Sequence, residues 1–121
     1  MGQIVEKLQA AGSEVIFMTP NMMCTGLSDL LMIEDLRAKI DSFCKRETEG
    51  ILAMYVEAAK EICHAYKVPV CDCYAKWRRM YECGVDITEL LSNKINHPDR
   101  DMHWLFAVSL VETIFNTINT N

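Results

Sequence analysis

Asn93-Lys94-Ile95-Asn96-His97-Pro98-Asp99-Arg100-Asp101-Met102-His103-Trp104 (residues 93–104) is the stretch from which the organisation of the chain follows. It is a polar loop centred on His97 that leads into an apolar helix, expected over Asp101–Asn116. Pro98 biases His97 toward an extended conformation, and Asp99 can cap the first turn of the helix. We therefore expect a fixed imidazole just before a helix N-terminus, a placement that suits a general base. The same pattern also fits a capped loop without a catalytic role.

Composition and charge limit what kind of protein this is. The 121 residues are 50% hydrophobic and 24% charged, which predicts a single globular domain over residues 1–121. The net charge of −5 argues against a nucleic-acid partner, whose binding surface would be basic. Neither an apolar run of about 20 residues nor a signal peptide is present, so we expect no membrane association and a cytoplasmic location.

The six cysteines are irregularly spaced and include no Cys-x-x-Cys pair, so we expect free buried thiols in a reducing compartment. Cys71 and Cys73 are too close in sequence for an ordinary disulfide, and on an extended strand their thiols would point to opposite faces. Cys63-His64 is a possible ligand pair, but the chain lacks the paired spacing of zinc sites. We predict no metal and no cofactor.

The order of hydrophobic patterns predicts an α/β fold with parallel strands. Helical periodicity alternates with two short apolar runs that are rich in β-branched residues. The expected helices are Gly2–Ala11, Leu30–Lys45, Ile51–Tyr66, Ala75–Tyr81 and Asp101–Asn116, with a capped turn at Asp86–Leu91 and strands at Glu14–Thr19 and Val68–Tyr74. A break is expected in the polar run Lys45–Gly50.

Two of these helices carry patterns that predict which side is buried. The helix at Ile51–Tyr66 is expected to use one apolar face, formed by Ile51, Tyr55, Ala58, Ala59, Ile62 and Tyr66. The last helix is apolar nearly all round from Met102 to Val108 and then carries a polar stripe of Ser109, Glu112, Thr113 and Asn116. We expect its first half to be buried and its second half to face solvent.

Asn96-His97-Pro98, followed by His103 and the apolar run Trp104–Ala107, resembles the last conserved block of the SGNH (GDSL-type) esterases and acylhydrolases. The similarity in element order extends from about Gly12 to Phe115, and the His-Pro block is its specific part. The resemblance implies part of a flavodoxin-like, three-layer domain, corresponding to the C-terminal half of the family fold. It gives His97 the role of catalytic base, and His103 a role in packing or hydrogen bonding.

The chain departs from the family pattern at the nucleophile and at the acid. The family's Gly-Asp-Ser-Leu block and oxyanion-hole residues are absent, and Ser28 in Gly26–Leu30 follows the wrong strand, so we interpret it as a turn or capping residue. The family acid lies three residues before the histidine, where this chain has Lys94, which cannot accept a hydrogen bond. Asn93, Asp86, Asp99 or a backbone carbonyl could orient His97 instead. Asp72 matches a family aspartate at a strand end, to which we assign a structural role.

Two functions follow from this comparison. In the first, the chain is the C-terminal part of an esterase or acylhydrolase acting on a small acyl ester, and a serine from the complementary N-terminal half completes the site. In the second, it is an inactive remnant that acts as a self-association module. The edge of the strand Glu14–Thr19 would have no partner in this chain, which favours a homodimer or larger oligomer. The alternative is a compact monomer whose first helix covers that edge.

Overall fold

The computed structural model describes residues 1–29 and 34–118. In chain order the elements are α1 (Gly2–Ala10), β1 (Phe17–Met18), α2 (Glu34–Thr48), α3 (Ile51–Ala65), β2 (Val70–Cys71), α4 (Cys73–Glu82), the 3₁₀ turn η1 (Thr88–Leu90) and α5 (His103–Ile118). The fold is mixed α/β and mostly helical, as the order of hydrophobic patterns predicted in outline. The predicted start of α2 at Leu30 lies outside the described residues.

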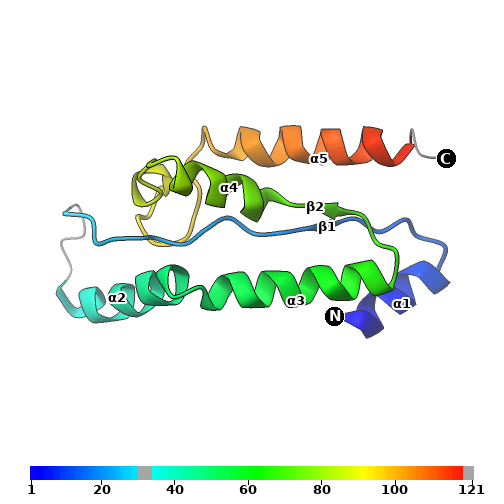
Figure 1. Cartoon of the computed structure of the whole chain (residues 1–121), viewed down its shortest axis with the longest axis horizontal. Coiled ribbons are helices and arrows are strands. Elements are labelled where there is room, and N and C mark those ends of the chain that lie inside the picture. The colour runs from blue at the N-terminus through cyan, green and yellow to red at the C-terminus, as the bar shows by residue number, and fades with distance from the viewer. Residues whose placement is uncertain (30–33, 119–121) are drawn as a thin grey trace.

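The sheet consists of two parallel strands, with Phe17 opposite Val70 and Met18 opposite Cys71. Figure 1 shows the strands between two groups of helices, with α1, α2 and α3 on one side and α4 and α5 on the other. Parallel pairing is therefore confirmed. Both strands are shorter than the predicted Glu14–Thr19 and Val68–Tyr74. In the described part of the chain β1 has a strand neighbour on one side only, which is β2.

β2 ends early because Asp72 caps α4, which begins at Cys73. The Asp72 carboxylate accepts a hydrogen bond from the backbone N–H of Ala75 at 3.1 Å, as an N-cap residue does. The prediction that the Cys71 and Cys73 thiols point to opposite faces is therefore wrong. Their sulfur atoms lie 3.8 Å apart, both buried, because the chain turns from strand to helix between them.

The break between α2 and α3 falls at Gly50, within the predicted run, although α2 stays helical through its polar residues as far as Thr48. Gly50 has φ of +78°, a left-handed conformation that glycine adopts without steric cost. The predicted buried face of α3 is wrong in part. Val56 and Cys63 are buried, whereas Tyr55 is 73% exposed.

Two groups of buried side chains hold the helices and strands together. The larger lies around Trp77 and joins α2, α3 and α4 to the segments before α2 and after α4; its buried members are Met22, Cys24, Ile40, Cys44, Val56, Tyr74, Trp77, Ile87 and Leu91. The smaller contains Val5, Cys63 and Val68, against which Phe17 and Val70 of the strands pack. Together they position the carboxyl ends of both strands and the loops that follow.

The prediction for α5 is wrong for its first half, whereas most of its second half is exposed as predicted, including Glu112, Phe115 and Asn116. Trp104 is 72% exposed and Val108 is 50% exposed, although both lie in the first half, and Ser109 of the predicted polar stripe is buried. Leu105 and Phe106 pack against the larger core, so the helix buries one side and not its first half. The exposed side forms a shallow groove of about 450 Å³ that includes Val111 and Phe115.

Among the described residues no helix is long and apolar enough to cross a membrane.

Candidate functional site

His97 lies in a short loop that is closed at its base by a β-bridge between Leu91 and Pro98. The backbone N–H of Ser92 donates to the carbonyl of His97 at 2.8 Å, and the N–H of Asp99 donates to Leu90 at 2.9 Å. Lys94 at the tip has φ of +57°, in the left-handed region that lets the chain reverse. The loop is therefore held by its own backbone, and His97 sits at its closing end.

Hydrogen bonds fasten this loop to the segment that follows β1. Asn21 donates through Nδ2 to the carbonyl oxygen of Asn96 at 3.0 Å. The N–H of Cys24 donates to the carbonyl of Ile95 at 2.8 Å. The segment from Thr19 onward leaves the carboxyl end of β1, so the His97 loop is tied to the end of the sheet at which open α/β proteins bind ligands.

The His97 side chain is exposed at the molecular surface, and its ring contacts two asparagines through Nδ1. Nδ1 lies 2.7 Å from Oδ1 of Asn96 and 2.9 Å from Nδ2 of Asn93. Asn93 Nδ2 also donates to Asn96 Oδ1 at 2.9 Å. In the part of the chain that the structure describes, the polar contacts of the ring are made at Nδ1, which leaves Nε2 directed away from them.

Of the three side chains predicted to orient His97, the structure places only Asn93 at the ring. Asp86 accepts instead from the N–H of Thr88 at 3.0 Å, and Asp99 accepts from Met102 N–H at 2.8 Å, which closes the turn that leads into α5. Lys94, at the position of the family acid, pairs with Glu89 at 2.9 Å. Asn96 was missed by the sequence analysis. The signal for it was the pair of asparagines three residues apart in front of His97.

The other two residues singled out in the sequence lie away from this network. His103 is exposed at the start of α5, and its ring is 6.4 Å from that of Phe106. The expectation that it belongs to a buried helix start is therefore wrong. Ser28 is 8% exposed, in the loop after β1, and has a polar partner of its own.

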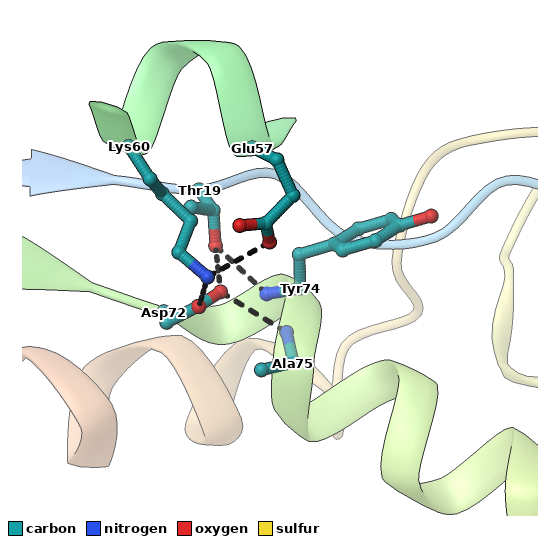
Figure 2. Close-up of polar contacts among 6 residues, drawn as sticks. All are labelled: Thr19, Glu57, Lys60, Asp72, Tyr74 and Ala75. Carbon is teal, nitrogen blue, oxygen red and sulfur yellow. Dashed lines mark hydrogen bonds and ion pairs between the residues drawn. The ribbon is translucent and has the colours of Figure 1, made fainter. Parts of the chain in front are cut away.

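A second polar group lies at the strand ends, shown in Figure 2, and joins both strands to α3 and α4. Thr19 donates to Oδ1 of Asp72 at 3.0 Å and accepts from the N–H of Tyr74 at 2.8 Å. Lys60 from α3 pairs with Oδ2 of Asp72 at 2.7 Å. Burial alone would raise the pKa of the Asp72 carboxyl, but hydrogen bonds from Lys60, Ala75 and Thr19 outweigh it, and the pKa is lowered. All these contacts are within the protein, which supports the structural role assigned to Asp72.

The buried carboxylate of Glu47 accepts hydrogen bonds from the loop after β1 and from Tyr74 of α4. Glu47 of α2 is 2% exposed, and its Oε2 accepts from the N–H of Met23 at 2.8 Å. Its Oε1 accepts from the hydroxyl of Tyr74 at 2.5 Å. Burial, together with this bond, raises the pKa of Tyr74, so the phenol stays protonated and remains a donor.

The cysteines are free, and five of the six are buried; Cys83 is exposed. Desolvation raises the pKa of Cys24 to about 12, with a further contribution from Cys44, whose sulfur is 2.7 Å away. Desolvation likewise raises the pKa of Cys73 to about 12. Both groups are thiols at neutral pH, and a thiol is a poor nucleophile and metal ligand. The buried free thiols predicted from the spacing are therefore confirmed for five positions.

Within residues 1–29 and 34–118, no three His, Cys, Asp or Glu side chains are grouped so that they could hold a metal ion. Comparison with known proteins returned no match, whether with family models, with curated proteins or with solved structures. The interpretation of the His97 loop therefore depends on its own geometry and on the resemblance of the Asn96-His97-Pro98 block.

Proposed function

We propose that this chain supplies the histidine base of a serine ester hydrolase of the SGNH type. The observation that carries the proposal is the position of the His97 ring. Its Nδ1 contacts two asparagines, which leaves Nε2 to accept the proton of a serine hydroxyl. Its loop is hydrogen-bonded to Asn21, in the segment that follows β1. A general base needs a fixed ring with one free nitrogen, which this arrangement offers.

The reaction requires a serine hydroxyl from a segment other than those described. Nε2 of His97 would take the hydroxyl proton as the serine oxygen attacks the ester carbonyl carbon. Collapse of the tetrahedral intermediate breaks the bond to the alcohol, which leaves with the proton from Nε2. Water then repeats the same two proton transfers, releasing the acid and restoring the serine. The proposed substrate class is a small acyl ester.

The position of the strands supports a shared site. β1 has an open edge in the described part of the chain, where a further parallel strand can pair. A strand added there would end on the same side as β1 and so bring its following loop toward that of His97. The serine block of the family follows a strand, which fits this geometry.

The test is labelling with a fluorophosphonate, which reacts with a serine activated by a histidine. It is applied to the longest polypeptide encoded by the reading frame that contains this chain. We expect labelling in the wild type and in a His64→Ala control, since His64 is exposed on α3, and loss of labelling in His97→Ala. Equal labelling of the His97→Ala variant would contradict the proposal.

A second candidate function, self-association, is favoured by the exposed side of α5. Trp104, Val108, Val111 and Phe115 are between 50% and 72% exposed and are spaced by four, three and four residues. That spacing averages about 3.7 residues, close to the 3.6 residues of one helical turn, so the four side chains lie along one face of α5. Because the surface is continuous and apolar, the occupant we propose is α5 of a second copy, related by a two-fold axis.

The exposed aromatic surface of α5 is smaller than a standard interface, so we expect the interface to include other surfaces as well. Trp104 and Phe115 present on the order of 300 Å² of aromatic surface on each copy, against about 800 Å² per partner in a standard interface. The edge of β1 that is unpaired among the described residues is a further surface that can contribute. Association and ester hydrolysis make separate predictions, since the first concerns α5 and the second His97.

A further inference from the structure

Asn93 has only one possible amide orientation in the His97 loop. Its Oδ1 accepts hydrogen bonds from the backbone N–H groups of Ile95, Asn96 and His97, each at 3.0 Å. Rotating the amide by 180° would place its NH₂ group against three donors, with no acceptor among them. The NH₂ group of Asn93 therefore faces the side chains of Asn96 and His97.

The orientation of Asn96 follows from that of Asn93. The Asn93 Nδ2 is 2.9 Å from Oδ1 of Asn96, a hydrogen bond that requires the Asn96 carbonyl oxygen at this position. With the Asn96 amide reversed, two NH₂ groups would meet. The same Oδ1 lies 2.7 Å from Nδ1 of His97. An amide carbonyl oxygen, which can only accept, is thus held against one ring nitrogen.

This contact determines which ring nitrogen carries the proton. If Nδ1 were unprotonated, its lone pair would face the lone pairs of Asn96 Oδ1 at 2.7 Å, a repulsive arrangement. With the proton on Nδ1, the contact becomes an N–H···O hydrogen bond. Asn93 Nδ2, 2.9 Å from Nδ1, then faces a second donor, but it keeps Asn96 Oδ1 as its acceptor, and the shorter contact of Nδ1 with Oδ1 favours the proton on Nδ1. The neutral ring then has its lone pair on Nε2.

We propose that Asn96 is the positioning residue for His97: its carbonyl oxygen accepts the Nδ1 proton, in place of the missing carboxylate, while Asn93 fixes the amide in that orientation. The importance of this inference rests on the proposed function, since a base at Nε2 must be unprotonated there. In serine proteases an amide in place of the acid lowers kcat by about 10⁴-fold, because it holds the wrong tautomer. Here a second amide prevents that error.

The test is the tautomer of His97, measured by long-range ¹H–¹⁵N correlation spectroscopy on the ¹⁵N-labelled chain. The spectrum is recorded above the ordinary titration range of imidazole, so that the rings are neutral. His97 is assigned with a His97→Gln variant. The predicted pattern is that of a ring protonated at Nδ1, the minor form of free histidine in water. Exposed His64 serves as an internal control and should show the ordinary protonation at Nε2.

Two variants then distinguish the effect of the Asn96 side chain from that of the loop backbone. Its side chain bonds only to Asn93 and His97 among the described residues, so Asn96→Ala leaves the backbone bonds of the loop in place. We expect His97 to revert to mainly Nε2–H in Asn96→Ala and to keep Nδ1–H in Asn96→Asp, which retains the acceptor. A wild-type ring protonated at Nε2 would overturn the proposal. So would an unchanged Nδ1–H form in Asn96→Ala, or an Nε2–H form in Asn96→Asp. None of these outcomes depends on esterase activity, so they are separate from the test of the proposed function.

Discussion

Replacing Asp72 by alanine should remove about 3 kcal/mol from the free energy of unfolding, because its carboxylate joins three parts of the fold (Figure 2). Loss of the α4 cap costs about 1 kcal/mol, and loss of the hydrogen bond from Thr19 costs about the same. The ion pair with Lys60 contributes a further ~1 kcal/mol, since both side chains are only about a quarter exposed, at 26% and 25%. Lys60 keeps Glu57 as a partner at 2.9 Å, which limits this last cost.

Asp72→Asn is the matched control, because asparagine caps helices as well as aspartate does but carries no charge. It should cost about 1 kcal/mol, as should Lys60→Met, and the double variant should cost less than the two together. The assay is urea denaturation followed by circular dichroism, with the melting temperature of Asp72→Ala expected to fall by roughly 10 °C. Equal stability of Asp72→Ala and the wild type, or equal losses in Asp72→Ala and Asp72→Asn, would refute the assignment of the cap.

The difference in unfolding free energy between the wild type and Asp72→Asn should depend on pH with a definite sign. The folded-state pKa of Asp72 is lowered, so its contribution is present above the unfolded value of about 4 and is lost as the pH falls through the folded value. The pKa of Lys60 is raised, chiefly by its hydrogen bond to Asp72, so its contribution is lost only as the pH rises through that higher value. The deficit of Asp72→Asn should therefore be constant at neutral pH and shrink in acid.

Three further results are expected. Glu47→Leu should cost about 2–4 kcal/mol in urea denaturation, because it leaves Met23 N–H and the Tyr74 hydroxyl buried without their acceptor; a loss below 1 kcal/mol would contradict this role. Light scattering at micromolar concentration should give at least a dimer, reduced to a monomer by Trp104→Glu but not by Tyr55→Glu on α3; a monomeric wild type would contradict the association surface. The isolated chain should hydrolyse p-nitrophenyl acetate no faster than its His97→Ala variant, since its sequence contains no Gly-Asp-Ser-Leu block to supply the nucleophile, and His97-dependent turnover would refute that view.

Helix boundaries and caps were predictable from the sequence because they depend on single residues. Gly12 ends α1 with φ of +80°, as a left-handed cap does. Asp99 closes the turn before α5, which begins at His103, two residues after the predicted Asp101. Each of these effects acts over one helical turn, so the neighbouring letters are enough to reveal it.

Strand ends and buried faces were less predictable because they depend on contacts across the fold. The run Val68–Tyr74 is apolar except at Asp72, yet this residue ends the strand and starts α4 by bonding Ala75 and Lys60. α5 is apolar on nearly every side in its first half, so the sequence alone could not decide which side packs on the core.

The sequence was enough to predict the central residue of the candidate site but not most of the residues around it. His97 and Asn93 were identified from the loop and from the resemblance, whereas Asn96 was not. Its role depends on the orientation of an amide, which is fixed by three backbone N–H groups brought together when the loop closes. Charge suggested Asp86 and Asp99 instead, but both cap neighbouring turns.

The most direct test of the central claim is kcat/KM for p-nitrophenyl acetate, measured on the longest polypeptide from the reading frame that contains this chain. A general base contributes about 10²–10⁴-fold to such a rate. We expect His97→Ala to lower kcat/KM by at least about 10²-fold without changing the melting temperature. His64→Ala should leave both quantities unchanged. A folded His97→Ala variant that keeps the wild-type kcat/KM would contradict the claim that His97 is the base of an ester hydrolase.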